Sequence, residues 1–312
     1  MTREALRRLL APIDPDEFVA TYWMQRALLI PGTPDKIGDL FSVPAFHAAV
    51  ATAARRPDAA RLGFAVRAGA TRAIAPAAVS AELASGNTIC VSAIELGHDP
   101  LATFAAALKR ELGFPGRAAV NAYLSPRGSG FSFVHFDARI ATTLQIAGRK
   151  RWRYSERSSL AWPAHNVRIA PDGSLDWHQP PSAWELAAGL PGDLDLVDVV
   201  LGPGDVLCLP AGTFHAAEAV DDLSLSININ FSYGGFFDLV LAHLTSRLDA
   251  MPAWRAPPPA LTTAELDSGV MPPQVSEYMS GRLADLRRIV DELDADRDTM
   301  SALWLAAMRP RR

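Results

Sequence analysis

The feature that most restricts the fold of this chain is a strict alternation of polar and apolar side chains over residues 223–233. Every second position from Ser224 to Ser232 is Ser or Asn, and the positions between them are Leu, Ile or Phe. A side-chain period of two is that of a β-strand, in which successive residues point to opposite faces of the sheet. The pattern therefore predicts a strand whose apolar face packs in a core while its polar face lies towards a cavity or solvent.

Strand patterns also occur elsewhere in the chain. The ranges are 27–30, 118–124, 131–137, 142–146, 150–154, 195–200 and 206–209. Within 150–154 the Lys, Trp and Tyr share one face of the strand, and the two Arg share the other. We expect the face with Lys150 to be buried and the face with the arginines to lie in water.

Helical patterns flank this strand-rich segment and divide the chain into three parts. Residues 1–110 are predicted to form a mixed region of helices and short strands that packs on the strands of the next part. Residues 111–233 hold those strands, with a loop-rich insertion at 155–195 of the kind that commonly shapes a substrate mouth. Residues 234–312 are predicted to be helical.

Two helices are indicated by specific signals. Asp14 offers a cap, Pro15 fits the first helical position and Glu17 the third, which together predict a helix start. Over residues 283–293, Leu, Ile and Val recur at helical spacing among Arg and Asp, which predicts an amphipathic helix. Its apolar stripe has two alternative partners, the chain's own strand-rich part or a second subunit in a homodimer.

The charge and cysteine content narrow the class of protein. The chain has 312 residues, a net charge of -4 at pH 7 and two cysteines, Cys90 and Cys208. Net acidity gives no general electrostatic reason to bind nucleic acid, and two cysteines provide neither a disulfide framework nor a Cys-x-x-Cys metal signature. Charges interrupt the first ten residues, and no uncharged run approaches the ~20 apolar residues that cross a bilayer. We expect a cytoplasmic protein without a membrane partner.

His135, Asp137 and His215 form a candidate metal site. In an extended chain residues i and i+2 point to the same face, so His135 and Asp137 lie side by side, and His215 would come from a distant strand. Two imidazoles and one carboxylate occupy one face of an octahedral ion and leave adjacent positions open, as in non-haem Fe(II) oxygenases. Each residue alone is more often a structural polar group, but the three together predict a metal-binding reaction centre.

Four sequence motifs occur in a fixed order along the chain. They are Asp-Glu-Phe at 16–18 leading to Leu-Leu-Ile at 28–30, His-Phe-Asp at 135–137, Gln-x-x-Gly-x-Lys-x-Trp at 145–152, and Pro-Gly-Asp-x-Leu-x-x-Pro-x-Gly-x-x-His at 203–215. Together they resemble the JmjC and cupin-like 2-oxoglutarate-dependent oxygenases, closest to the ribosomal-oxygenase branch. The resemblance implies a mainly β fold with a double-stranded β-helix, or jelly-roll, core and helical regions at both ends. It also implies Fe(II) as the metal, with 2-oxoglutarate and dioxygen as cosubstrates.

The resemblance assigns roles to further residues. Lys150 stands where the family places a basic residue for the distal carboxylate of 2-oxoglutarate, and the strand pattern independently points it inwards. Asn230 and Ser132 stand where relatives place an amide and a hydroxyl on the cosubstrate. Tyr123 and Asn121, which share a strand face, are predicted to line the pocket.

The resulting hypothesis is an Fe(II)- and 2-oxoglutarate-dependent dioxygenase that hydroxylates a C–H bond on a protein or peptide side chain and releases succinate and carbon dioxide. The same iron site would also serve hydroxylation of a small natural product or oxidative N-demethylation. An alternative from another class is a catalytically silent cupin module that binds metal. The resembled family has a dimerising helical region after the barrel, which the residues after Tyr233 are long enough to form.

Overall fold

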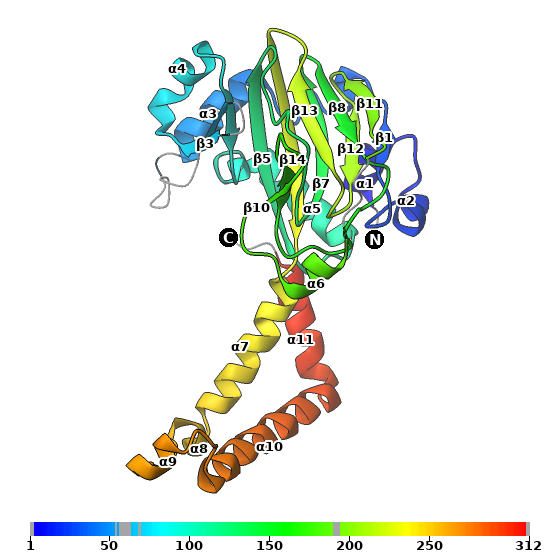
Figure 1. Cartoon of the computed structure of the whole chain (residues 1–312). Helices are drawn as coiled ribbons and strands as arrows, with labels where there is room; N and C mark the ends of the chain where they lie inside the picture. Colours follow the sequence, from blue (N-terminus) through cyan, green and yellow to red (C-terminus); the bar gives the residue numbers. More distant parts are fainter. Residues whose placement is uncertain (1–2, 54, 56–63, 68–69, 190–193, 310–312) are drawn as a thin grey trace. The chain divides into compact units, whose positions relative to one another are not determined.

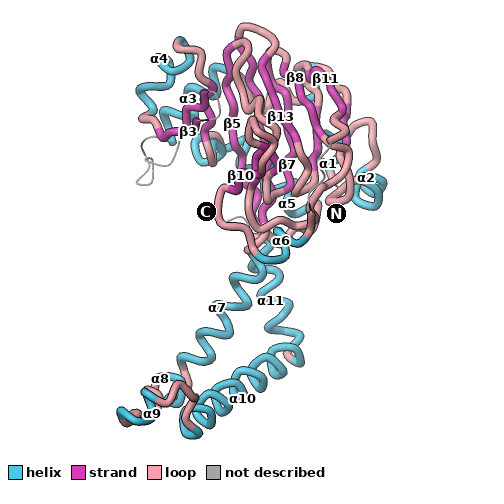
Figure 2. Tube along the Cα trace, in the orientation of Figure 1, coloured by secondary structure: helices cyan, strands magenta, loops and turns pink. Residues whose placement is uncertain are grey.

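The computed structural model describes residues 3–53, 55, 64–67, 70–189 and 194–309. The chain forms two compact units, Met1–Tyr233 and Gly234–Arg312. The described strands and the N-terminal helices all belong to the first unit, whereas the described part of the second consists of helices and loops (Figure 2). The strands and the N-terminal helices therefore form one body.

Two antiparallel sheets make up the centre of the first unit (Figure 1). The order in the larger sheet is β1 (Leu28–Ile30), β12 (Val206–Leu209), β7 (Ile140–Ala147), β14 (Leu223–Ser232), β5 (Arg117–Pro126), β4 (Thr88–Val91), β2 (Phe64–Arg67) and β3 (Ala70–Ala73). The order in the smaller sheet is β10 (Leu175–Trp177), β9 (Val167–Ile169), β6 (His135–Phe136), β13 (His215–Ala219), β8 (Lys150–Tyr154) and β11 (Val197–Leu201). From β5 to β8 and from β11 to β14 the chain alternates between the two sheets, as in a jelly roll. The predicted mainly β fold with a jelly-roll core is confirmed.

Strand β14 places its two sets of side chains in different surroundings. It lies between β5 and β7 in the larger sheet. Its apolar set, from Leu225 to Phe231, is buried in the main hydrophobic core. Its polar set, from Ser226 to Asn230, is at most 8% exposed and lines a cavity. The alternation at 223–233 thus belongs to a strand that is covered on both faces.

Helices of the N-terminal region share the main core with the apolar face of the larger sheet. The helices are α1 (Glu4–Leu10), α2 (Pro15–Thr21), α3 (Val43–Ala53), α4 (Val79–Ala84) and α5 (Asp99–Glu111), with 3-10 turns η1 (Pro34–Lys36), η3 (Pro76–Ala78) and η4 (Ile94–Gly97). Asp14 caps α2 as predicted, since its carboxylate accepts the N–H groups of Asp16 and Glu17. Trp23, which follows α2, contacts Phe231 of β14 with ring centroids 5.1 Å apart. The N-terminal region therefore covers the apolar face of the strand whose other face lines the cavity.

The segment that carries the first histidine is less regular than its sequence predicts. A strand is expected at 131–137, but the regular part, β6, is limited to His135–Phe136. Gly130 has a φ of +150°, and a Cβ at this position would come within 2.3 Å of the Ala217 carbonyl oxygen. The segment nevertheless stays against β13, because Ala217 N donates to Phe131 O at 2.7 Å. The close backbone approach requires glycine here and interrupts the strand.

The insertion at 155–195 is more ordered in its described part than a loop. It contains β9, β10 and the short helix α6 (Ala183–Ala187). Strand β9 pairs with β6, with Arg168 opposite His135, so the insertion extends the smaller sheet beside the metal motif. Sequence periodicity cannot detect strands of three residues, which explains why they were not predicted.

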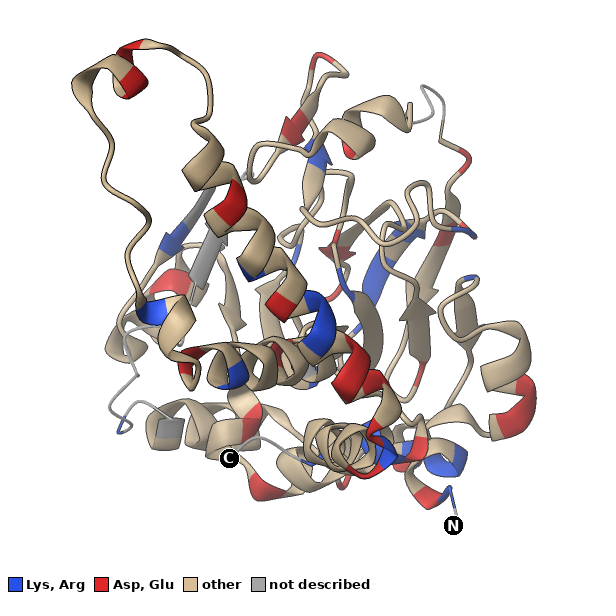
Figure 3. Cartoon of the chain, turned by 90° about the horizontal axis from the view of Figure 1, so that it is seen from below, with Lys and Arg blue, Asp and Glu red and all other residues tan. Residues whose placement is uncertain are grey.

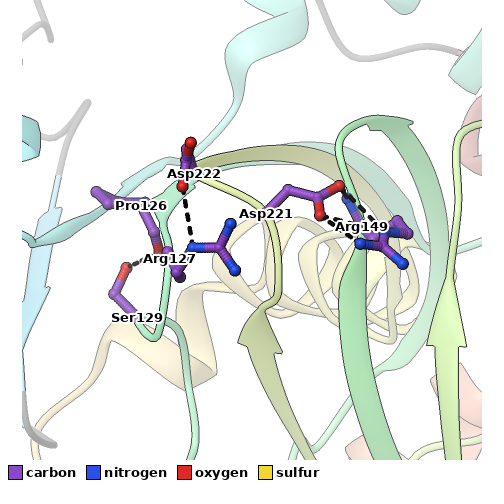
Figure 4. A network of polar contacts seen from close by, with 6 residues as sticks. All are labelled: Pro126, Arg127, Ser129, Arg149, Asp221 and Asp222. Carbon is purple, nitrogen blue, oxygen red and sulfur yellow. Dashed lines mark hydrogen bonds and ion pairs between the residues drawn. The ribbon is translucent and has the colours of Figure 1, made fainter.

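The basic run at 149–153 lies at the surface, as the strand pattern predicts. Arg149 donates hydrogen bonds to both carboxylate oxygens of Asp221, and Arg127 donates to Asp222 at 2.9 Å on the neighbouring turn (Figure 4). Blue and red segments are interspersed over the ribbon in Figure 3. Arg149 and Arg127 therefore have acidic partners in the same chain.

The second unit is helical, as its sequence predicts. Its described helices are α7 (Gly235–Asp249), α8 (Pro252–Arg255), α9 (Thr263–Asp267), α10 (Pro273–Ala295) and α11 (Arg297–Met308). The amphipathic stripe lies on α10, where Ile289 and Leu293 are buried and Leu283 is 46% exposed. Arg247 of α7 pairs with Glu292 of α10 at 2.6 Å. None of the described helices is long and apolar enough to span a membrane.

Candidate metal centre

The three predicted metal ligands converge in the smaller sheet. One ligand atom from each of His135, Asp137 and His215 lies within 4.8 Å of the others. Strands β6 and β13 pair so that His135 stands directly opposite His215, and the two ring centroids are 4.3 Å apart. Residues that are opposite in an antiparallel pair have neighbouring side chains. The register of this pair therefore brings together two histidines that are 80 residues apart in the sequence.

Both imidazole rings are oriented by backbone carbonyls. His135 Nδ1 lies 3.1 Å from Phe133 O, and His215 Nδ1 lies 2.8 Å from Thr213 O. A proton on each Nδ1 would be donated to that carbonyl, which leaves the lone pair of Nε2 for a metal ion. Trp152 also stacks on His215, at 5.8 Å between centroids with an interplanar angle of 25°. These contacts thus favour the tautomer and the ring orientation that suit metal ligation.

The Asp137 carboxylate is held by a residue of the insertion. Asn166 Nδ2 donates to Asp137 Oδ1 at 2.6 Å, and Asn166 Oδ1 accepts the N–H of Ala138 at 2.7 Å. The amide therefore binds the ligand-bearing segment through both of its ends. The second carboxylate oxygen of Asp137 remains available as a ligand.

The charges of the cluster suit a divalent cation. Burial opposes ionisation of Asp137, but the electrostatic interactions of its carboxylate with Arg139 and the two imidazole rings and the hydrogen bond from Asn166 together lower its pKa. Burial and the neighbouring His135 lower the pKa of His215 to about 4. At neutral pH the cluster therefore presents an ionised carboxylate and a neutral imidazole, which are the forms that bind metal. The donor set fits Fe(II), the ion implied for a site of two histidines and one carboxylate.

A cavity of about 640 Å³ opens beside the three ligands, a volume within the range of small-molecule sites. Its walls come from strands of both sheets and from the insertion. Ser226 and Asn228 of the polar face predicted at 223–233 also line it, together with side chains to which the sequence assigned no role, among them Cys90, Ser92, Phe131, Phe133, Arg139, Trp152, Asn166, Arg168, Asp176, Trp177 and His178. The candidate metal centre is therefore accessible to a ligand.

Lys150 points into this cavity from β8, where the inward residues are buried and the arginines are exposed, as predicted. The side chain is deeply buried, with 3% of the residue exposed, and its Nζ donates to Ser226 Oγ at 3.1 Å. Burial lowers the pKa of Lys150 to about 8, so the amine is mostly protonated at neutral pH. Within the described parts of the chain, no carboxylate forms an ion pair with it. A buried ammonium of this kind offers a site for an anionic group.

The other predicted pocket residues divide into two groups. Asn230, Tyr123 and Asn121 line the cavity, and Asn121 Nδ2 lies 3.5 Å from the Tyr123 hydroxyl. Ser132 is exposed, is not among the described residues that line the cavity, and uses its carbonyl to accept a hydrogen bond from Arg153. The expected position of Ser132 is therefore corrected, because an odd offset of three residues from His135 turns it to the opposite side.

Three further polar residues of the site were not identified from the sequence as ligand contacts. Ser226 is the hydroxyl that Lys150 contacts, and its place in the alternating pattern of 223–233 was the available signal. Arg139 follows Asp137 by two residues. Because residues i and i+2 of an extended chain point to the same face, the spacing that indicates His135 and Asp137 would also have indicated Arg139. Asn166 had no detectable signal, since it lies in the insertion and its role depends on long-range pairing.

The fold and the site together define a jelly-roll protein with a candidate site for a divalent metal. Residues 99–236 match the model of the JmjC domain family. Outside the fold, the sequence is therefore similar to JmjC proteins and, among them, to ribosomal oxygenases.

Individual relatives extend this result. The chain is 27% identical over 263 residues to the uncharacterized protein YxbC of Bacillus subtilis, covering 80% of this chain and 77% of that protein. It is 29% identical over 253 residues to ribosomal oxygenase 1 of Gallus gallus, covering 76% of this chain and 39% of that protein. The chain thus spans well under half of the length of this ribosomal oxygenase.

A solved structure resembles most of the chain. The structure of YcfD, a ribosomal oxygenase from Escherichia coli, in complex with cobalt and succinic acid has a TM-score of 0.56 at 18% identity. The match covers 94% of this chain and 70% of that protein. At this identity the likeness shows a shared fold.

Proposed function

We propose that the protein is an Fe(II)- and 2-oxoglutarate-dependent dioxygenase that hydroxylates a C–H bond of a protein or peptide side chain. One observation carries the proposal: His135, Asp137 and His215 share a cavity with Lys150, a buried ammonium that has no carboxylate partner in the described chain. A metal bound by two imidazoles and one carboxylate keeps open positions for a chelating acid and for dioxygen. Lys150 would pair with the second carboxylate of that acid.

The chain's residues would position both groups. His135 and His215 would hold iron through Nε2, and Asp137 through the oxygen that Asn166 leaves available. When bound, iron and 2-oxoglutarate supply the oxidising power, since the oxo acid is oxidised to succinate and carbon dioxide as dioxygen is reduced. Ser226 would orient the Lys150 ammonium, while Asn230, Tyr123 and Asn121 line the cavity as further candidates for cosubstrate contacts.

Aromatic side chains would shield the reaction from water. Phe131, Phe133 and Trp152 line the cavity around the two histidines, and Phe133 lies 5.0 Å from His135 between ring centroids. Excluding water strengthens electrostatic interactions inside the site and limits side reactions of an oxidising centre. This environment suits an oxygenase better than a module that only binds metal, which has no need of a lysine placed beside the cluster.

The class of substrate follows from the relatives. Several are named ribosomal oxygenases, and the Escherichia coli neighbour is described in complex with cobalt and 2-oxoglutarate. These names support a protein substrate and the same cosubstrate for this chain. Hydroxylation of a small natural product and oxidative N-demethylation would use the same residues, and the product mass separates them. A homodimer through residues 234–312 and a cytoplasmic location both stay predictions.

The test is an anaerobic titration of the purified protein with Fe(II) and 2-oxoglutarate, followed by the visible charge-transfer band of the chelate. We expect the band in the wild type. We expect the Lys150→Met variant to bind 2-oxoglutarate about tenfold or more weakly, because a charge-assisted contact is lost, while iron binding is retained. The matched control is Arg151→Met, an exposed residue on the other face of the same strand. An iron-loaded wild type without the band would refute the proposal.

A substrate assay completes the test. The loaded enzyme is incubated with a peptide mixture under air, and the products are analysed by mass spectrometry. A mass increase of one oxygen identifies hydroxylation, whereas loss of a methyl group with formaldehyde identifies N-demethylation.

A further inference from the structure

Arg139 is a charged side chain of the cavity to which the proposed function gives no role. It is partly buried and lines the same cavity as the metal ligands. Coulombic interaction joins its guanidinium to the Asp137 carboxylate and to the Tyr123 hydroxyl. A guanidinium stays protonated at any pH that a protein tolerates. A second positive charge, besides Lys150, therefore lies beside the candidate metal centre.

Arg139 differs from Arg168 and Lys150, the other cationic side chains of the cavity, in its hydrogen bonds and ion pairs. Arg168 is paired with Asp176 at 2.6 Å, and Lys150 donates to Ser226. Within the described parts of the chain, no hydrogen bond and no ion pair within 4.0 Å engages the Arg139 guanidinium. A guanidinium has five N–H donors in a fixed planar arrangement, and a partly buried one without acceptors is unfavourable. The donors of Arg139 are therefore available to a ligand in the cavity.

The charges of the loaded site point to the nature of that ligand, on the basis of the proposed function. A divalent iron, a dianionic 2-oxoglutarate, the Asp137 carboxylate and the Lys150 ammonium sum to zero. Both carboxylates of 2-oxoglutarate are then used, one at the metal and one at Lys150. Of the acidic residues that line the cavity in the described chain, Asp137 is a metal ligand and Asp176 is paired. Arg139 is the positive charge that stays uncompensated.

We propose that Arg139 binds a carboxylate group of the prime substrate, and that this group lies close to the carbon that is oxidised. A guanidinium matches a carboxylate through two parallel N–H···O bonds, which fixes orientation as well as charge. The substrate class is therefore a carboxylate-bearing molecule. Two sources share this chemistry, an acidic side chain within a peptide and a free small carboxylic acid.

The test measures binding to the anaerobic protein loaded with Fe(II) and 2-oxoglutarate, through the change that a bound probe makes in the visible charge-transfer band. The probes are N-acetyl-glutamic acid α-amide, its neutral isostere N-acetyl-glutamine amide, and free propionate. We expect the acidic probe to bind the wild type at least about tenfold more tightly than its neutral isostere. Arg139→Gln should abolish this difference, and Arg139→Lys should restore part of it. The matched control, Arg151→Gln, changes an exposed arginine of β8 and should keep it.

The outcomes identify the source of the carboxylate and separate failure of this inference from failure of the proposed function. Binding of propionate as well as the acidic amide indicates that a free acid suffices, whereas binding of the amide alone indicates a peptide. The inference is overturned if the acidic probe does not bind the wild type at millimolar concentration, or if Arg139→Gln keeps the preference. It is also overturned if Arg139→Gln weakens 2-oxoglutarate or metal binding tenfold, since Arg139 would then belong to the cofactor site. A wild type that lacks the band altogether refutes the proposed function, and this inference with it.

Discussion

The two polar walls of the cavity differ in how their groups are satisfied. The wall of the smaller sheet, here the ligand wall, carries His135, Asp137, His215 and Lys150. The wall of β14 in the larger sheet, here the amide wall, carries Ser226, Asn228 and Asn230. On the amide wall, Asn228 Oδ1 accepts from Thr143 Oγ1 at 2.9 Å, and Asn230 Nδ2 donates to the Asn228 carbonyl at 3.3 Å.

The ligand wall retains groups that its own chain does not satisfy. The two histidines use Nδ1 for backbone carbonyls, which leaves Nε2, and the Lys150 ammonium has one hydroxyl as its hydrogen-bond acceptor in the described chain, besides the Tyr123 ring 5.7 Å away. Buried polar groups that bond to each other stabilise the fold, whereas a buried charge without a counter-charge is unfavourable until a ligand supplies one. We therefore expect substitutions of the metal ligands and Lys150 on the ligand wall to act on binding, and substitution of Asn228 on the amide wall to act mainly on stability.

The largest effect is expected for a metal ligand. His215→Ala removes one of three donors. Loss of a residue that only hydrogen-bonds to a metal ligand typically weakens metal binding by about 10–100-fold, so we expect a larger loss of Fe(II) affinity here. The measurement is anaerobic metal titration, with His47→Ala as the control because His47 lies outside the cavity in the described structure. A His215→Ala protein that binds iron as tightly as the wild type would show that this histidine is structural.

The next effect is the pH dependence of 2-oxoglutarate binding. The pKa of Lys150 is lowered to about 8 in the free protein by burial, and a bound carboxylate should raise it. Below pH 8 the free protein already carries the proton, so the affinity should be flat. Above pH 8 the proton must be taken up on binding, so the dissociation constant should rise by up to about tenfold per pH unit.

The control for this pH profile is Lys150→Met, which cannot titrate and should bind weakly with little change over the same interval. The dissociation constant is measured anaerobically at fixed Fe(II) concentration. An affinity of the wild type that is independent of pH from 7 to 10 would contradict a direct contact between Lys150 and the cosubstrate.

A smaller effect is expected for Asn166, which bridges the insertion to the ligand wall. Asn166→Ala removes the amide that donates to Asp137 and should weaken metal binding by about tenfold, because partners of metal ligands orient them. Asn166→Asp should be worse, since it places a second carboxylate against Asp137. Equal metal affinity in all three proteins would indicate that the insertion does not position the ligand.

The smallest effect on binding is expected on the amide wall. Asn228→Ala leaves the buried Thr143 hydroxyl without its acceptor and should lower the free energy of unfolding by about 1–3 kcal/mol. The 2-oxoglutarate dissociation constant should change little compared with Lys150→Met. Thermal or urea unfolding tests the expected loss of stability, and cosubstrate titration on the same samples tests the expected unchanged affinity. A variant with wild-type stability and lost cosubstrate binding would reverse the assignment of the two walls.

Much of the fold was predictable because it is local. Alternation at 150–154 and 223–233 indicates both the strands and the faces of Lys150 and Asn230, since a strand places every second residue on the same side. The cap of Asp14 on α2 depends on three residues of sequence and was predicted for the same reason. Strands β9 and β10 have three residues each, too few to show an alternating pattern in the sequence. Gly130 interrupts the strand expected before His135.

By itself the sequence determined which residue types are present and which face of a strand each occupies, and so identified His135, Asp137, His215 and Lys150. The tertiary structure alone decided that His135 stands opposite His215, that Asn166 binds Asp137, and that Ser132 lies outside the cavity. The physical reason is that periodicity reports the direction of a side chain relative to its own backbone. Which strands pair, and in what register, depends on contacts between residues far apart in the sequence.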